Sequence, residues 1–504
     1  MARPLTRPGQ PPARRGASPG GPRRPARPGG ARDAGAQARP GGPRDLALEA
    51  LARVDQGAWA NLVLPRMLAA SGLAAGDRAA VTDLVYGSLR MRGAIDHALR
   101  PLSRQPLERL EPSVLSGLRL GAYELLFAGT APHAALNEVV GAVRRGGTAG
   151  QSGYVNAVLR QLARRPPRWP DRAGDPLGWA TTRGSHPAWV VEEAIALLGE
   201  DEAMALVEAD NQRPQVTLRA TPGRGGRDEL LAELEAAGVP ARPSQLSPDC
   251  VVLEHGEPGA LAAIAEGRAV VQDAASALVA PALGAAPGEL VLDLGAGPGG
   301  KAGHLAALGA RVLAVELHPG RARMVRDLAS RLGVEGRLWS VVGDGTRPPI
   351  GHGRADAALV DAPCSNLGSL RRRPEARWRH TPDEIEGLSA LQSALLDGAV
   401  AAVRPGGHVL YSVCTWTRAE TDAVVDAALE RHPELEPAPL SGLGELEEAA
   451  GAGGPTAAAG ASAATGPSAA AGPAGPAPVG ARRQFWPHRD GSDGIFLARL
   501  RKIR

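Results

Sequence analysis

The feature that most constrains the fold is an alternation of two patterns in the second half of the chain. Short apolar runs, predicted to be strands, lie at 289–297, 310–318, 338–344, 355–363 and 406–414. Segments with apolar residues at helical spacing follow them, at 301–309, 320–333, 383–404 and 420–432. This alternation is typical of a doubly wound, mainly parallel sheet. The segment 483–502 predicts a last strand or hairpin that returns to the sheet, with Ile495, Leu497 and Leu500 buried.

The first half of the chain is predicted to be helical. Between 45 and 165, apolar residues recur at helical spacing in several segments that Gly and Pro separate. This region predicts an all-helical bundle. The arginines near the C-terminal end of this region are interpreted as a solvated helix face, although they could face RNA. They are Arg144, Arg145, Arg160, Arg164 and Arg165.

A linker and a small domain are predicted to join the two halves. Several Pro and Trp residues at 166–190 indicate the linker, which ends in a helix start at 186–187. From there to 270, helical segments alternate with short β-like runs, so 166–270 is expected to hold the linker and a small α+β subdomain. Cys250 opens one of these runs and is interpreted as a core residue.

Two stretches have compositions that predict disorder. Residues 1–44 contain ten Arg and one Asp among many Pro and Gly. They are either an arm that binds nucleic-acid phosphates or a solubilising tail, and the sequence leaves both open. Residues 446–481 form an Ala/Gly/Pro tract that reads as a flexible insertion. The C-terminal domain is therefore expected to comprise 271–445 and 482–504.

Composition excludes several classes of protein. No apolar run approaches the ~20 residues that span a bilayer, and the N-terminus lacks the apolar stretch of a signal peptide. Three cysteines among 504 residues are too few for a disulfide framework or a zinc cluster. We therefore expect a reduced, cytoplasmic setting, no resident metal and a monomer.

A glycine-rich loop follows the first strand of the predicted sheet and precedes a helix. It reads Gly295-Ala296-Gly297-Pro298-Gly299-Gly300-Lys301. Glycines let a cofactor approach the backbone, and the helix start supplies N–H donors. The next strand ends at Glu316, whose carboxylate could accept bonds from both ribose hydroxyls of NAD or of S-adenosylmethionine. Asp344 could contact an adenine amino group or could be an ordinary turn residue.

Lys301 stands out because the chain has only two lysines among 57 basic residues. An ammonium is compact, whereas a guanidinium is a wide fork. The retained lysine indicates a small cation at the site, for example for a cofactor carboxylate.

Two of the three cysteines close strands at the ligand-binding edge of the sheet. Cys364 stands in DAPCSNLG, which begins at Asp361, and Cys414 stands in VLYSVCT. A single cysteine is usually a small core residue. Two thiols at one cofactor edge instead indicate nucleophilic chemistry, because helix N-termini and cations favour the thiolate.

These motifs resemble those of the RNA cytosine-C5 methyltransferases, the Sun/Fmu or NOL/NOP group. Further similarity lies in VQDAASALVA (271–280), RRRPEARWR (371–379) and DGIFLARL (493–500). The helical region resembles the NusB-like domain of the family's 16S ribosomal RNA member. The resemblance implies a NusB-like bundle, a small α+β subdomain and a Rossmann-like methyltransferase domain.

The resemblance also implies roles for particular residues. Cys414 matches the nucleophile that adds to C6 of cytosine, and Cys364 matches the cysteine that helps release the product. Asp361 is expected to hydrogen-bond the base. The family's S-adenosylmethionine contacts match residues 295–301, Glu316, Asp344 and Asp361. The expected RNA contacts are Arg371, Arg372, Arg373, Arg377 and Arg379.

Two positions depart from the family pattern. Val413 stands where the family usually has Thr, and Gly295-Ala296-Gly297 stands where it usually has Cys-Ala-Ala. Neither change removes a reacting group.

The expected function is methylation of cytosine C5 in RNA, with 16S ribosomal RNA as the expected substrate and S-adenosylmethionine as the cofactor. The target base must leave its stack to reach such a site. Three alternatives remain: a transfer RNA substrate, a non-catalytic RNA-binding factor, and an NAD-dependent dehydrogenase. The paired cysteines argue against the last two.

Overall fold

The computed structural model describes residues 41–256, 258–443 and 480–504. The predicted basic arm (1–44) and the predicted insertion (446–481) therefore lie almost wholly outside the described residues. The described chain reaches slightly into both, because the first helix begins at Pro43 and Ala481 is buried. No helix within the described ranges is long and apolar enough to cross a membrane.

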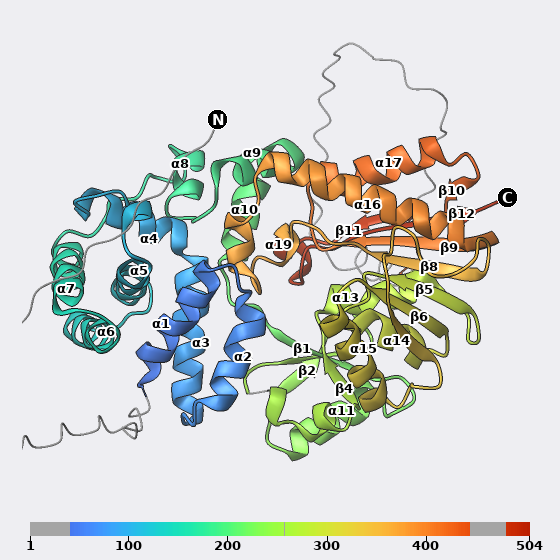
Figure 1. Ribbon diagram of the computed structural model, residues 1–504, viewed down its shortest axis with the longest axis horizontal. Helices are drawn as coiled ribbons and strands as arrows, with labels where there is room; N and C mark the ends of the chain where they lie inside the picture. Colours follow the sequence, from blue (N-terminus) through green and yellow to red (C-terminus); the bar gives the residue numbers. More distant parts are fainter. Residues whose placement is uncertain (1–40, 257, 444–479) are drawn as a thin grey trace, which may run out of the picture. The chain divides into compact units, whose positions relative to one another are not determined.

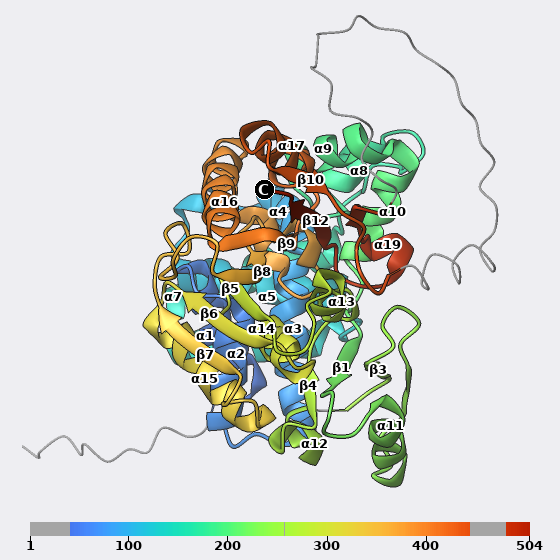
Figure 2. The same ribbon diagram turned by 90° about the vertical axis from the view of Figure 1, so that its right-hand side faces the viewer.

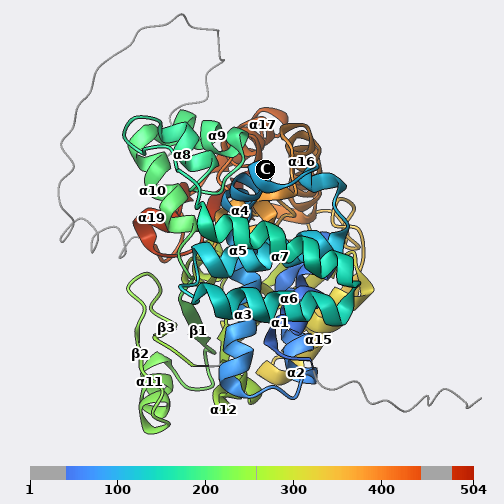
Figure 3. The ribbon, with the colours of Figure 1, turned by 90° about the vertical axis from the view of Figure 1, so that its left-hand side faces the viewer.

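A helical bundle forms the first domain (Figures 1 and 3). Its helices are α1 (Pro43–Asp55), α2 (Ala60–Ala70), α3 (Ala75–Arg90), α4 (Arg92–Leu99), α5 (Pro112–Leu126), α6 (Pro132–Gly146) and α7 (Ala149–Arg164). One apolar cluster joins all of them. Helix α5 packs closely because it carries glycines: a Cβ at Gly121 would stand 2.3 Å from a methyl carbon of Leu159, and one at Gly117 2.6 Å from a methyl of Val143.

Three helices follow the bundle: α8 (Pro176–Thr181), α9 (Ala188–Leu198) and α10 (Glu200–Asp210). Helix α8 lies within the segment that the sequence predicted as a linker. The sequence assigned α9 to the small α+β subdomain. Its buried residues pack with Leu367, Leu370 and Trp416 of the C-terminal half.

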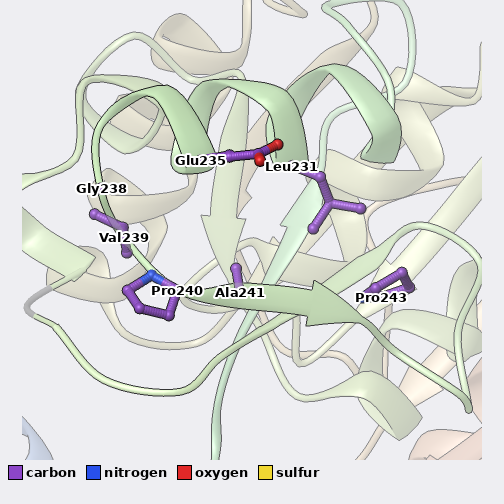
Figure 4. Close-up of a pocket in the computed structure, with 7 residues that line it drawn as sticks. All are labelled: Leu231, Glu235, Gly238, Val239, Pro240, Ala241 and Pro243. Carbon is purple, nitrogen blue, oxygen red and sulfur yellow. The ribbon is translucent and has the colours of Figure 1, made fainter.

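The small domain is an antiparallel sheet with strand order β2-β3-β1-β4. Its strands are β1 (Val216–Ala220), β2 (Ala241–Pro243), β3 (Cys250–Leu253) and β4 (Ala269–Val271), and its helices are α11 (Arg227–Ala236) and α12 (Ala262–Ala265). Cys250 is buried, as predicted. A hollow of about 560 Å³ lies between α11 and the edge strand β2 (Figure 4), and none of the predicted site residues lines it.

The C-terminal domain contains an eight-stranded sheet, with β10-β12-β9-β8-β5-β6-β7 in order and β11 paired to β12. Its strands are β5 (Leu290–Leu294), β6 (Arg311–Glu316), β7 (Leu338–Val342), β8 (Ala355–Asp361), β9 (Val403–Val413), β10 (Leu435–Pro437), β11 (Arg482–Gln484) and β12 (Phe496–Lys502). Strands β5 to β9 are parallel, whereas β12 runs antiparallel to β9. Ile495, Leu497 and Leu500 are buried, so the predicted returning strand is confirmed.

Helices cover both faces of this sheet (Figure 2). They are α13 (Ala274–Leu283), α14 (Gly300–Ala307), α15 (Pro319–Leu332), α16 (Pro382–Ala402) and α17 (Asp422–Arg431), and a short α19 (Pro487–Asp490) precedes β12. Alternate residues of β5 point to opposite faces: Val291 joins the cluster of α13 to α15, whereas Leu292 joins the cluster of α16 and α17. The strand order reverses beside β5, and this is where open α/β sheets bind ligands.

Candidate active site

The glycine loop fits its surroundings only because it lacks side chains. Gly295 has φ +79°, and a Cβ there would stand 2.5 Å from the carbonyl oxygen of Asp361. Gly299 has φ +107°, and its Cβ would stand 3.1 Å from the Cα of Val325. Both glycines are therefore required by backbone conformation and close packing. The loop lies against the end of β8, the strand that leads to Cys364.

Glu316 ends β6 as the sequence predicted, and its carboxylate is directed at the glycine loop. One oxygen accepts from the backbone N–H of Gly297 at 3.1 Å, and the other accepts from that of His318 at 3.0 Å. The side chain is 3% exposed. Each oxygen retains a lone pair for a further donor. The carboxylate can therefore accept hydrogen bonds from a diol while it holds the loop.

Asp344 lies just after β7 and is exposed. One of its carboxylate oxygens accepts from the backbone N–H of Thr346 at 2.9 Å and from its hydroxyl at 2.8 Å. The bond from this hydroxyl is the first cause of a lowered pKa of the Asp344 carboxyl. These contacts are those of a turn residue, and the second oxygen leaves room for a ligand.

Two exposed apolar side chains at this edge were not predicted as site residues from the sequence. Leu317 follows Glu316 and is 61% exposed, and Val342 ends β7 and is 53% exposed. A large apolar residue directly after a strand-ending carboxylate was the available signal. Such side chains offer an apolar surface to a flat ring.

Lys301 and Asp361 form an ion pair at the first turn of α14. Burial opposes the charge of Lys301, but the adjacent Asp361 carboxylate outweighs it and raises the pKa of the ammonium. The lysine predicted to meet a cofactor carboxylate is therefore held by a carboxylate of the protein. Its charge also lies near Cys414.

Asp293, in the middle of β5, is a buried acid that the sequence reasoning did not select. It is 0% exposed, and neither carboxylate oxygen has a hydrogen-bond partner among the residues that the structure describes. Burial, together with the charge of Asp361, raises the pKa of Asp293 well above its ordinary value. A cationic group placed beside it would restore its charge.

The two predicted cysteines meet at the carboxyl ends of β8 and β9. Their sulfur atoms are 3.3 Å apart, and both are free thiols. A hydrogen bond from Cys364 lowers the pKa of Cys414, with further help from the charges of Arg373 and Lys301 and against the effect of burial. The same contact raises the pKa of Cys364 well above its ordinary value. Ionisation is therefore easier at Cys414 than at Cys364, with Cys364 as the S–H donor to the Cys414 thiolate.

Asn366 also lies beside the two thiols. It was not predicted as a site residue from the sequence. Its backbone is left-handed, with φ 62°, a conformation that Asn tolerates better than most residues. The side-chain N–H₂ donates to the carbonyl of Cys364 at 2.8 Å, and the side-chain oxygen accepts from Arg373 at 2.5 Å. That oxygen lies 3.4 Å from the sulfur of Cys414.

The basic segment 371–379, predicted to bind RNA, is largely turned into the protein. Arg377 is 0% exposed, and its guanidinium donates to the carbonyls of Arg90, Ser185 and Asp210 at 3.3, 2.9 and 3.4 Å. Arg90 and Asp210 are the last residues of α3 and α10. A cation at the carboxyl ends of two helices satisfies carbonyls that have no partner within the helix.

Two other residues of the segment contact the junction between α1 and α2. Arg379 donates to the carbonyl of Gly57 at 3.1 Å, and its guanidinium carbon lies 3.9 Å from the ring centre of Trp59. Glu375 accepts from the backbone N–H of Ala60, the first residue of α2, at 2.8 Å. The segment therefore connects the helical bundle to the sheet domain.

The remaining arginines of the segment contact acidic or amide groups of the sheet domain. Arg372 contacts Asp273 at 2.8 Å and Asp493 at 3.1 Å, and the buried Arg371 lies 3.7 Å from Asp493. Phosphate contacts by Arg371, Arg372 and Arg377 are not supported by these positions, because their guanidinium groups are buried or already paired within the protein. For Arg373 and Arg379, which are half-buried, RNA contact stays a prediction.

Comparison with known proteins agrees with this architecture. A family model described as 16S rRNA methyltransferase RsmB/F matches residues 280–501. A NusB family model matches 42–164, and a model of the ferredoxin-like domain of RsmF/B-type methyltransferases matches 186–258.

Individual relatives extend over nearly the whole chain. A Mycobacterium tuberculosis protein that carries the name methyltransferase is 39% identical over 91% of this chain and 96% of its own length. Ribosomal RNA small subunit methyltransferase B of Escherichia coli is 33% identical over 76% of this chain and 88% of its own. The chain belongs to the RsmB/F methyltransferase family.

The crystal structure of PH0851 is also similar, with a TM-score of 0.76 and 25% identity over 91% of this chain and 99% of that one. The predicted fold class is thereby confirmed: a NusB-like bundle, a small ferredoxin-like domain and a Rossmann-like methyltransferase domain. Membership of the RsmB/F family makes the chain an S-adenosylmethionine-dependent methyltransferase, so the dehydrogenase alternative is excluded.

Proposed function

We propose that this RsmB/F methyltransferase methylates C5 of a cytosine in 16S ribosomal RNA through a transient bond between Cys414 and C6 of the base. The observation that carries the proposal is the contact between two thiols, 3.3 Å apart, at the sheet edge that also holds the glycine loop and the Lys301–Asp361 pair. The Escherichia coli relative is named as a small-subunit ribosomal RNA methyltransferase. A cytoplasmic location and a monomeric state belong to the same proposal.

The residues at the edge of the sheet suit S-adenosylmethionine. Glu316 would accept the ribose hydroxyls, and Leu317 and Val342 would contact the adenine faces. The unpartnered carboxylate of Asp293 would meet the cationic amino acid portion beside the glycine loop. Asp344 would take the adenine amino group. When bound, this cofactor supplies an electrophilic methyl group.

Cys414 would make C5 of the base nucleophilic by adding to C6. The carbon C5 of cytosine belongs to an aromatic ring and attacks electrophiles poorly. Addition of the Cys414 thiolate to C6 forms a carbon–sulfur bond and pushes an electron pair onto C5, which can then take the methyl group. A hydrogen bond that the Asp361 carboxylate accepts from a protonated N3 of the base would favour this addition. The same carboxylate forms the ion pair with Lys301.

Cys364 would act after methyl transfer. Once the sulfur of Cys414 is bonded to carbon, it no longer carries a charge beside Cys364, so the pKa of Cys364 falls. Cys364 can then release its own proton to solvent and, as a thiolate, accept the proton from C5. The electron pair of the C–H bond reforms the ring double bond as the Cys414–C6 bond breaks and Cys414 leaves as thiolate.

Substitution of each cysteine tests the proposal. Cys414→Ala should abolish methyl transfer to 16S ribosomal RNA and leave cofactor binding unchanged, as measured by isotope transfer and calorimetry. Cys364→Ala should accumulate a covalent protein–RNA adduct on a denaturing gel. Bisulfite sequencing of the product identifies C5 of cytosine as the methylated atom.

The third cysteine is the matched control. Cys250 is buried in the small sheet, and Cys250→Ala should retain methylation. Turnover by Cys414→Ala, or an unmodified C5 in the product, would refute the proposal.

A further inference from the structure

We infer that Glu420 is a positioning residue that holds the segments of Cys364 and Cys414 together. Glu420 lies in a turn of 3₁₀-helix (Arg418–Glu420) that follows β9, and it is 0% exposed. It contacts neither sulfur. The inference rests on the proposed function only in naming Cys414 the nucleophile.

The need for such a residue arises where the strand ladder ends. Strands β8 and β9 are parallel neighbours up to the pair Asp361 and Ser412. Beyond it, the N–H of Ala362 still donates to the carbonyl of Ser412 at 3.2 Å. Both cysteines lie past that last regular contact. Their separation therefore depends on one further backbone bond, from the N–H of Gly368 to the carbonyl of Cys414 at 3.0 Å, and on side-chain interactions.

Glu420 bonds the residue that follows each cysteine. One carboxylate oxygen accepts from the backbone N–H of Ser365 at 2.8 Å. The other accepts from the Ser365 hydroxyl at 2.5 Å and from the Thr415 hydroxyl at 3.2 Å. The two hydroxyls are 2.8 Å apart, so a closed triangle of polar contacts joins the two segments.

Further bonds fix the carboxylate itself. Thr417 donates its hydroxyl to Glu420 at 2.9 Å, and Gln392 donates its amide at 3.0 Å. The same amide donates to the carbonyl of Pro363 at 2.9 Å, directly before Cys364. Tyr411 donates its hydroxyl to the backbone carbonyl of Glu420 at 2.7 Å.

The donors to the Glu420 carboxylate are all neutral. A buried carboxylate is costly unless it is well hydrogen-bonded. The hydrogen bonds of Glu420 are made largely to the two cysteine segments. Its negative charge also lies close to Cys364 and opposes ionisation of that thiol. The hydrogen bonds hold the two segments together, and the charge favours the arrangement with Cys364 as S–H donor and Cys414 as acceptor.

The distance between the two thiols can be measured by their conversion to a disulfide. Diamide takes two electrons and two protons from the pair: an S–S bond forms, and the N=N group of diamide is reduced to a hydrazine. This reaction needs neither RNA nor cofactor. Its rate, followed by mass spectrometry of the 364–414 crosslink, depends strongly on how closely the thiols are held.

Glu420→Ala should slow the crosslink by at least about tenfold, because small displacements of reacting groups are costly in rate. Loss of the negative charge alone would favour the thiolates and speed the reaction, so the expected sign separates position from charge. Ser365→Ala, which removes one hydroxyl from the triangle, should slow it about fivefold, the equivalent of one ordinary hydrogen bond.

Glu124→Ala is the matched control, because Glu124 is a buried carboxylate on α5 that pairs with Arg44. It should leave the crosslinking rate unchanged. Wild-type rates in both Glu420→Ala and Ser365→Ala, or equal slowing by Glu124→Ala, would overturn the inference. If Glu420→Ala does not fold, Ser365→Ala decides by itself.

Methylation provides a second readout. Glu420→Ala should lower kcat and leave the cofactor Kd unchanged, because Glu420 lies behind the thiols and not at the glycine loop. Failure of the proposed function would appear as turnover by Cys414→Ala and would leave the crosslinking result intact. A raised cofactor Kd with an unchanged kcat would contradict the positioning role.

Discussion

The glycine loop at 295–301 and the basic segment at 371–379 both suggest ligand binding in the sequence, yet the structure uses them differently. The loop lies at the carboxyl edge of the sheet, beside Glu316 and the thiols. The basic segment is directed into the protein, where its side chains bond the ends of α2, α3 and α10. The difference lies in what partners surround each polar group, and a sequence does not display those partners.

The strongest test of this difference is Arg377→Leu. The substitution removes the buried donor of the Ser185 and Asp210 carbonyls and of the Asn211 side-chain oxygen, whereas the Arg90 carbonyl keeps its bond from the Ser185 hydroxyl. Since unsatisfied buried polar groups cost 1–3 kcal/mol each by mutational data, the free energy of unfolding should fall by about 3 kcal/mol or more. Chemical denaturation measures this loss.

An exposed arginine provides the control. Arg144 lies at the exposed end of α6, and Arg144→Leu should change stability by less than about 0.5 kcal/mol. The salt dependence of RNA binding should be the same in Arg377→Leu as in the wild type. A weaker salt dependence of RNA affinity in Arg377→Leu, with unchanged stability, would show that Arg377 contacts RNA phosphates.

Lys301→Met tests the glycine loop. It removes the cation that pairs with Asp361 at the start of α14 and leaves two carboxylates, Asp361 and Asp293, near each other. We expect the affinity for S-adenosylmethionine to change about tenfold or more, the usual size for a charged hydrogen bond. Calorimetry measures it.

The chain's other lysine provides a matched control. Lys502 donates to the carbonyls of Val400 and Val403, away from the thiols. Lys502→Met should lower stability and leave cofactor affinity unchanged. An equal effect of the two substitutions on affinity would show that Lys301 has no special place at the site.

The fold could be predicted from the sequence because periodicity reports burial directly. The strand–helix alternation predicted the sheet, and the pattern of Ile495, Leu497 and Leu500 predicted its last strand. Strand-ending residues such as Glu316 also followed, since the carboxyl ends of parallel strands meet at one edge. These features depend only on local spacing.

Residues whose roles depend on distant partners could not be predicted. Asn366 lies two residues after Cys364 in the sequence, but its bond to Arg373 and its approach to Cys414 arise from folding. Glu420 is an ordinary helix-start carboxylate in the sequence and becomes a fully buried acceptor in the structure. Charge in a sequence therefore says less about function than the position of a strand end.

Arg373 belongs to the basic segment, yet its charge acts on the thiols of the candidate active site. The Cys364 S–H bond is the first cause of the lowered pKa of Cys414, and the charge of Arg373 adds to it. Arg373→Ala should raise the pKa of Cys414, so less thiolate is present at neutral pH. Because a shift of one unit is a tenfold change in thiolate fraction, alkylation of Cys414 should slow by up to about tenfold.

The pH dependence of alkylation measures this change. In the wild type, the rate should rise with pH through a midpoint below the ordinary value of a thiol, and Arg373→Ala should move that midpoint upward. Arg379→Ala, from the same segment but directed at Trp59, should not move it. Equal shifts in the two variants would mean that the segment acts only as a whole.

The smallest effect is expected from Glu375→Gln. Burial raises the pKa of Glu375. One of its carboxylate oxygens has no hydrogen-bond partner in the described part of the chain, and the other accepts from the N–H of Ala60. A glutamine oxygen can replace that acceptor, and removal of a buried charge offsets the loss of charge at the N-terminus of α2. The free energy of unfolding should therefore change by less than about 1 kcal/mol, whereas Glu375→Ala, which leaves the Ala60 N–H unpaired, should cost about 1–2 kcal/mol. If Gln and Ala were equally destabilising, the charge and not the hydrogen bond would join the basic segment to the helical bundle.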